Sequence, residues 1–85
     1  MDILERMRLH PTSDWTIRDI ETLCAAEEIS CLPPRGGGSH FKIAHAALPE
    51  ILTIPYKRPI KPVYIRRFVH FVDAVRRIAG KDLRR

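Results

Sequence analysis

The chain has 85 residues and a mass of 9.8 kDa, which suffices for one hydrophobic core and excludes a multi-domain enzyme. Its 45% hydrophobic and 29% charged residues are typical of a globular protein and exclude a disordered or membrane-embedded chain. No apolar run approaches the roughly 18 residues that span a bilayer, and no signal-peptide core is present. We therefore expect a cytoplasmic protein that does not contact the membrane.

The net charge of +5 is unevenly distributed along the chain. Up to Pro34 there are three basic residues against seven acidic ones, a net charge of −4. From Arg35 onward there are twelve basic residues against three acidic ones, a net charge of +9. The second half is therefore expected to attract a polyanion, although charge alone does not distinguish RNA, DNA, an acidic protein or an anionic membrane.

Residues 1–15 read as an N-terminal extension that precedes the main domain. Ile3, Leu4 and Met7 fall on one side of a short helical turn, which we expect to end before Pro11.

The first helix of the domain has a clear start. Thr16 followed by Asp19 predicts a capping box, and Trp15 with Ile20 predicts a hydrophobic staple around it. The helix is expected over residues 17–28.

Three short strands are expected next. Residues 29–34 form an extended edge segment with paired prolines, residues 35–38 a turn, residues 39–45 an alternating strand and residues 51–56 a β-branched strand. The alternation sends Phe41, Ile43, Leu52 and Ile54 to the core and His40 and Lys42 to the opposite face.

A proline-spaced linker, residues 57–62, leads into the last helix, which has Pro62 at its first position and Gly80 as its stop. Its apolar residues keep helical spacing throughout: Ile65, Phe68, Val69, Val72, Val75 and Ala79. The predicted fold is α+β in the order α-β-β-β-α, a small antiparallel three-stranded sheet with both helices on one face. The domain covers residues 16–80, and residues 81–85 form a basic tail.

The glycine run before Ser39 and His40 is the first candidate functional feature. Three glycines allow positive φ and close approach of a ligand, so their N–H groups can cradle a phosphate that Arg35 and Lys42 neutralise. The alternative is a flexible β-turn with no ligand.

His40 is the candidate for proton transfer. An imidazole that titrates near neutral pH can protonate a leaving 5′-oxygen or activate a ribose 2′-hydroxyl, the chemistry that metal-free RNA cleavage requires. The alternative is a surface histidine without a function. We expect His45 at a strand end, His70 on the polar face of the last helix and His10 at the end of the first helical turn.

A metal site is not expected. Cys24 and Cys31 are six residues apart without the compact spacing of a zinc knuckle, and we interpret them as reduced thiols. The chain shows no other cofactor motif, so no cofactor is predicted.

The combination of a capped helix, Arg35-Gly-Gly-Gly-Ser-His40, the strand Leu52-Thr-Ile-Pro55 and a closing helix resembles the HicA-type toxin family of bacterial toxin–antitoxin pairs. The resemblance covers roughly Thr16 to Ile78. It implies a fold like that of double-stranded-RNA-binding domains, ribonuclease activity on messenger RNA, and inhibition by an acidic HicB-type antitoxin. It also maps the catalytic histidine of the family onto His40.

The sequence and the resemblance together predict a metal-independent endoribonuclease (mRNA interferase) with His40 as general acid or base. The predicted substrate-binding residues are Arg35, Gly38, Ser39, Lys42, Lys57, Arg58, Lys61 and Arg66. Two alternatives stay open at this point: a non-catalytic RNA-binding module, and an interaction protein whose basic face serves an acidic partner.

Overall fold

Three helices and three strands make up the described part of the chain, which in this computed structural model comprises residues 2–78 and residue 80. In chain order they are α1 (Ile3–Leu9), α2 (Ile17–Glu27), β1 (Ser30–Leu32), β2 (His40–Ala44), β3 (Leu52–Pro55) and α3 (Pro62–Ile78). The protein is therefore α+β, with an antiparallel sheet of strand order β1-β2-β3. Ala79 and the predicted tail, residues 81–85, lie outside the described residues.

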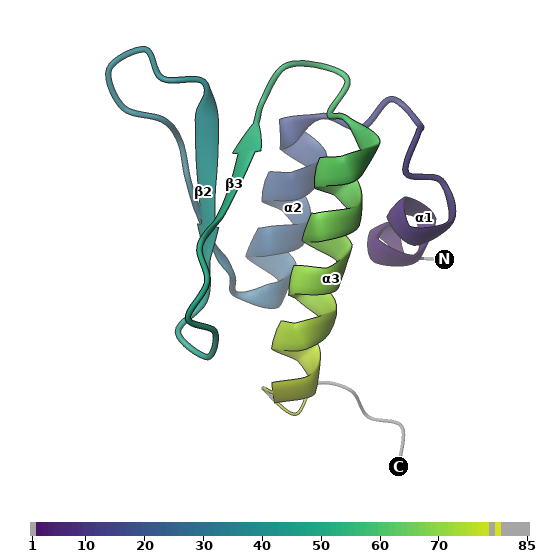
Figure 1. Cartoon of the computed structure of the whole chain (residues 1–85). Coiled ribbons are helices and arrows are strands. Elements are labelled where there is room, and N and C mark those ends of the chain that lie inside the picture. The colour runs from purple at the N-terminus through teal and green to yellow at the C-terminus, as the bar shows by residue number, and fades with distance from the viewer. Residues whose placement is uncertain (1, 79, 81–85) are drawn as a thin grey trace.

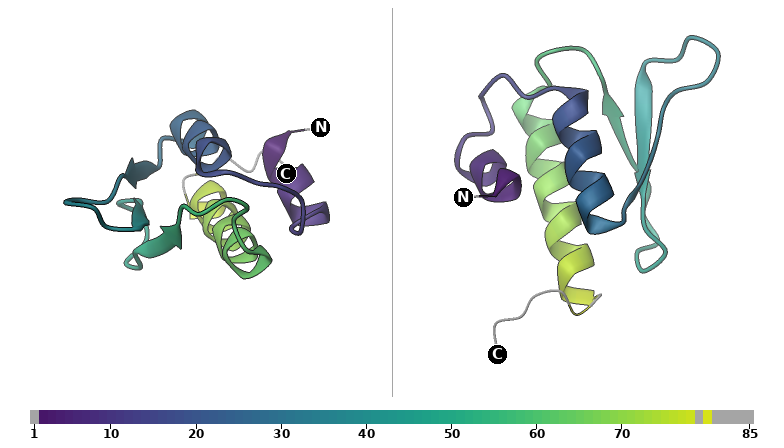
Figure 2. Two further views of the ribbon diagram at one scale, coloured as in Figure 1. Left: turned by 90° about the horizontal axis from the view of Figure 1, so that it is seen from above. Right: turned by 180° about the vertical axis from the view of Figure 1, so that it is seen from behind.

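The elements form three layers. Figure 1 shows the sheet on one side, α2 and α3 side by side in the middle, and α1 beyond them. The view from above in Figure 2 shows the same order. Both long helices thus cover the same face of the sheet, as predicted, and the opposite face is open.

The helix at the N-terminus changes the predicted element order. The sequence predicts only a short helical turn here, whereas α1 is a seven-residue helix capped by Asp2, whose carboxylate accepts a hydrogen bond from the Glu5 N–H at 2.8 Å. Leu4 and Met7 are buried in the same core as the other elements. This segment packs against α3, so it forms the third layer of the fold.

The capping box predicted for α2 is present. The Thr16 hydroxyl accepts from the Asp19 N–H, and the Asp19 carboxylate accepts from the Thr16 N–H at 2.9 Å. These bonds satisfy backbone donors that the first helical turn leaves unpaired. The helix ends one residue earlier than predicted, because Glu28 adopts a left-handed conformation with φ of 59°.

Strand β2 divides the sheet into its two faces. Phe41 and Ile43 are buried under the helices, whereas His40 and Lys42 are exposed on the other side. In the register of the sheet, Lys42 lies between Leu32 on β1 and Thr53 on β3, and His40 lies opposite Pro55. The predicted faces of this strand are therefore confirmed.

Helix α3 completes the core. The apolar stripe predicted from its periodicity is buried over its described length, and Phe41 and Ile54 of the sheet belong to the same cluster. Phe71, which the predicted stripe does not include, is also buried and only 2% exposed. The buried arc of α3 is wider than one stripe because the sheet and α1 both pack on it.

Candidate active site

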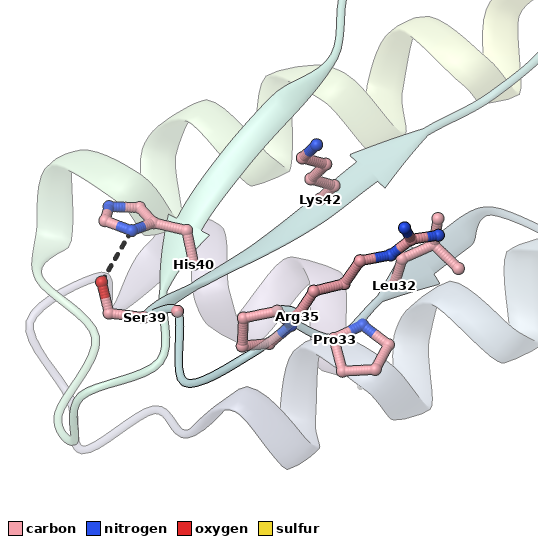
Figure 3. Close-up of a pocket in the computed structure, with 8 residues that line it drawn as sticks. Leu32, Pro33, Arg35, Ser39, His40 and Lys42 are labelled. Carbon is pink, nitrogen blue, oxygen red and sulfur yellow. Dashed lines mark hydrogen bonds between the residues drawn. The ribbon is translucent and has the colours of Figure 1, made fainter.

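An open groove of about 410 Å³ lies between the glycine turn and the exposed face of the sheet. It is lined by Leu32, Pro33, Pro34, Arg35, Gly38, Ser39, His40 and Lys42. Figure 3 shows His40 and Lys42 on β2, with Ser39 and Arg35 on the loop before it. The fold thus brings five of the predicted site residues to one place.

The turn that closes the groove has a geometry that suits glycine. Gly36 and Gly37 have φ of 52° and 81°, a region that residues with a side chain seldom adopt. The turn is closed by a hydrogen bond from the Gly38 N–H to the Arg35 carbonyl at 3.0 Å. At Gly38 an added Cβ would lie 3.1 Å from Pro34 and 3.3 Å from the Arg35 carbonyl oxygen, so this position is also tightly restricted.

His40 has one hydrogen-bonding partner in the groove. The Ser39 hydroxyl lies 2.9 Å from Nδ1 of the His40 ring, the contact drawn as a dashed line in Figure 3. A hydroxyl both donates and accepts, so it can serve the neutral ring as donor and the protonated ring as acceptor. The contact orients the ring through Nδ1 and leaves Nε2 for a ligand.

Two predicted phosphate-binding residues lie in a neighbouring hollow. Lys57 and Lys61 line a space of about 210 Å³ together with Pro55, Pro59 and Tyr64. Both lysines are exposed, and neither forms an ion pair with a carboxylate in residues 2–78. The two linings share no residue among those described, but Pro55 of the hollow is paired with His40 of the groove in the sheet.

The remaining two predicted binding residues lie elsewhere. Arg58 donates to both carboxylate oxygens of Asp14, with the shortest contact 2.6 Å, and this pairing lowers the pKa of the Asp14 carboxyl. Arg66 lines a separate hollow on the side of α3 that faces α1, beside Met7 and His70. The structure therefore does not bring Arg58 or Arg66 together with His40.

Some residues around the site were not predicted. Leu32, Pro33 and Pro34 form one wall of the groove, and Tyr64 forms part of the neighbouring hollow. The paired prolines stand directly before the glycine turn, so their position in the sequence was a usable signal. No sequence pattern marks Tyr64 as a site residue. Its place in the hollow depends on the packing of α3 against β3, which brings it near Pro55.

No group of three or more histidine, cysteine, aspartate or glutamate side chains that could hold a metal ion occurs among the residues that the structure describes. Within the same residues, no helix has the length and apolar character needed to cross a bilayer.

Comparison with protein-family models, with curated proteins and with solved structures finds no match for the chain.

Proposed function

We propose that the protein is a metal-independent endoribonuclease that cleaves mRNA, the toxin of a HicA-type pair with a fold like that of double-stranded-RNA-binding domains. The observation that carries this proposal is the His40 ring, held by Ser39 in an open groove that Arg35 and Lys42 line. The sequence motif Gly38-Ser39-His40 and the sheet with two helices on one face also support it.

In the proposed reaction a ribose 2′-hydroxyl attacks the adjacent phosphorus, the bond to the 5′-oxygen breaks, and a cyclic phosphate remains. His40 either takes the proton from the 2′-hydroxyl or gives a proton to the leaving 5′-oxygen. Arg35 and Lys42 stabilise the negative charge that builds up on the phosphoryl oxygens. The groove is open to solvent, so a strand of RNA reaches the ring without any rearrangement of the fold.

Replacement of His40 tests the proposal. His40→Ala is expected to lower RNA cleavage by about a hundredfold or more, the usual contribution of a general acid or base. His40→Gln should be nearly as inactive, because an amide hydrogen-bonds but does not titrate near neutral pH. The measurement is the rate of cleavage of an end-labelled single-stranded RNA, with RNA affinity followed in parallel by fluorescence anisotropy.

His70→Ala is the matched control, because this histidine is exposed on α3 and lines a different hollow. It should cleave like the parent, and a chelator should leave the parent rate unchanged. Undiminished cleavage by His40→Ala would contradict the catalytic role. RNA binding by a parent protein that does not cleave would instead support a non-catalytic RNA-binding module.

The proposed regulator is an acidic antitoxin that covers the groove. Its carboxylates would pair with the cations that otherwise bind phosphates, so antitoxin and RNA should compete. Co-purified acidic partner protein should therefore suppress both cleavage and RNA binding. Unchanged RNA affinity in the complex would count against a shared surface.

A further inference from the structure

We propose that the hollow lined by Pro55, Lys57, Pro59, Lys61 and Tyr64 is a nucleotide subsite for the residue next to the scissile bond of single-stranded RNA. This inference rests on the proposed function, because it extends the RNA-binding groove at His40 by one subsite.

The hollow and the groove are linked through the pairing of β2 with β3. His40 and Pro55 are paired across β2 and β3, and Cα atoms of such partners lie about 5 Å apart. The Tyr56 N–H also donates to the Ser39 carbonyl at 3.2 Å, which holds the start of the linker against the end of the loop. Pro55 lines the hollow, so the hollow includes a residue one strand away from His40. A strand bound over His40 would place its neighbouring nucleotide at this residue.

The hollow carries positive charge. Lys57 and Lys61 lie in the hollow, and no carboxylate of the described residues pairs with either ammonium group. Arg58 stands between them in sequence, but Asp14 holds its guanidinium with two hydrogen-bonded oxygens. Two cations thus remain available at the hollow, which suits one bridging phosphate.

The hollow also has an apolar wall. Pro55, Pro59 and the half-buried Tyr64 give the hollow flat, apolar surfaces, and the Arg67 guanidinium lies 5.7 Å from the centre of the Tyr64 ring. Sites that bind single-stranded nucleic acid commonly combine basic side chains, which contact the phosphates, with an aromatic ring on which a base stacks. A base reaches such a wall only when it is unstacked, and a duplex keeps its bases stacked inside. The arrangement therefore favours a single strand.

Binding is measured by fluorescence anisotropy in a His40→Ala background, so cleavage does not interfere. The probe is a labelled single-stranded RNA of about eight nucleotides, and a duplex of the same sequence serves for comparison. Replacing Lys57 and Lys61 together by glutamine should weaken single-strand binding about tenfold or more. Tyr64→Leu keeps the apolar bulk and should weaken it about tenfold, with little effect on the duplex.

The matched control replaces Arg18 and Arg77 by glutamine. These arginines are exposed on α2 and α3, form no ion pair within the described residues, and their loss removes the same charge of two. In the protein with His40 intact, the lysine variant should have a higher KM, while its kcat on saturating RNA stays within about twofold of the parent. The reason is that these lysines would bind the ground state and the transition state equally. The control should change neither value.

A lysine variant that binds the single strand like the control would overturn the subsite, even if the parent cleaves RNA, and the proposed function would stand. Equal loss of duplex and single-strand binding in Tyr64→Leu would also overturn it, as would a parent protein without RNA affinity. If RNA binding by His40→Ala is normal and depends on Lys57 and Lys61, but the parent does not cleave, the hollow stands as a nucleotide-binding site and the catalytic proposal fails.

Discussion

The three consecutive glycines between Arg35 and Ser39 are restricted to glycine by different features of the backbone and its surroundings. Gly36 and Gly37 have open space where a Cβ would be, so only their positive φ restricts them. Gly38 has no such φ, but a Cβ there would press on Pro34 and on the Arg35 carbonyl. The turn thus fixes the direction in which the chain enters β2, and with it the place of His40.

Cys24 and Cys31 are unequal thiols. Cys24 is buried on α2, and contact with Cys31 together with burial raises the pKa of the Cys24 thiol. The Cys24 thiol in turn stabilises the Cys31 thiolate and lowers the pKa of Cys31, which is also partly exposed. A thiolate is the nucleophilic form, so Cys31 is the more reactive residue.

Alkylation checks this assignment. Iodoacetamide at mildly alkaline pH should modify Cys31 first and leave Cys24 largely protected until the protein unfolds. Cys24→Ala should raise the pKa of Cys31 and move its labelling profile to higher pH. Peptide mapping by mass spectrometry reads out both sites, and equal labelling of the two thiols in the folded protein would refute the prediction.

At the scale of elements, α3 is the centre of the core, and Phe68 is its largest fully buried side chain. Phe68→Ala should lower the free energy of unfolding by about 3 to 5 kcal/mol, because it removes the apolar contacts of an aromatic ring and leaves a cavity. Thermal unfolding measures the loss, since about 1 kcal/mol shifts the Tm of so small a domain by roughly 4 to 8 °C.

Val63→Ala on the same helix is the control. Val63 is 43% exposed, so its truncation should change the free energy of unfolding by no more than about 0.5 kcal/mol. If the Tm of Phe68→Ala equals that of Val63→Ala, the packing described for α3 is contradicted.

An ion pair fastens α1 to α3. Arg8 donates to both oxygens of Asp73, at 2.7 and 2.9 Å, and these hydrogen bonds lower the pKa of the Asp73 carboxyl from its ordinary 3.8. A carboxyl with a lowered pKa in the folded state contributes stability above its ordinary pKa and loses that contribution as the pH falls through the lowered value.

Asp73→Asn should therefore destabilise the protein at neutral pH, by less than about 1 kcal/mol because solvent screens the pair, and the difference from the parent should vanish in strong acid. Urea unfolding at several pH values measures this. Glu50 is an exposed carboxylate that forms no ion pair within the described residues. Its replacement, Glu50→Gln, should change the free energy of unfolding by the same small amount at every pH. A pH-independent effect of Asp73→Asn would mean that the carboxylate acts through packing alone.

At the scale of the whole molecule, the acidic first half partly neutralises the basic second half. Among the described residues, four long-range ion pairs join the halves: Arg8 with Asp73, Arg58 with Asp14, and Arg76 with both Glu27 at 2.7 Å and Asp2 at 3.9 Å. Arg58 and Arg76 are thereby occupied. The cations that line the groove and the hollow have no such partner within the described residues: Arg35, Lys42, Lys57 and Lys61.

The number of available cations sets the salt dependence expected of the proposed RNA binding. Contacts from these four side chains to phosphates should give a slope of about −3 for log affinity against log salt concentration on single-stranded RNA. Anisotropy titrations over a range of KCl concentrations measure the slope. A response near zero would exclude the electrostatic account of this surface.

Local features of the fold followed from the sequence. The capping box at Thr16, the faces of β2 and the start of α3 at Pro62 were all predicted, because each depends on residues within a few positions of one another. The placement of Arg35, Ser39, His40 and Lys42 around one space was likewise foreseeable, since they are neighbours in the chain.

Other features depend on residues that are distant in the sequence. The burial of Ile60, whose N–H donates to the Trp15 carbonyl at 2.9 Å, joins segments that no local pattern connects. In the same way, pairing with Asp14 occupies Arg58, and the packing of α1 places Arg66 in a different hollow from Lys61. The sequence by itself thus determined the elements from α2 to α3 and the glycine turn before His40, because propensity, capping and alternation are short-range. Only the tertiary structure decided which cations adjoin His40, because ion pairing and packing depend on which distant segments meet.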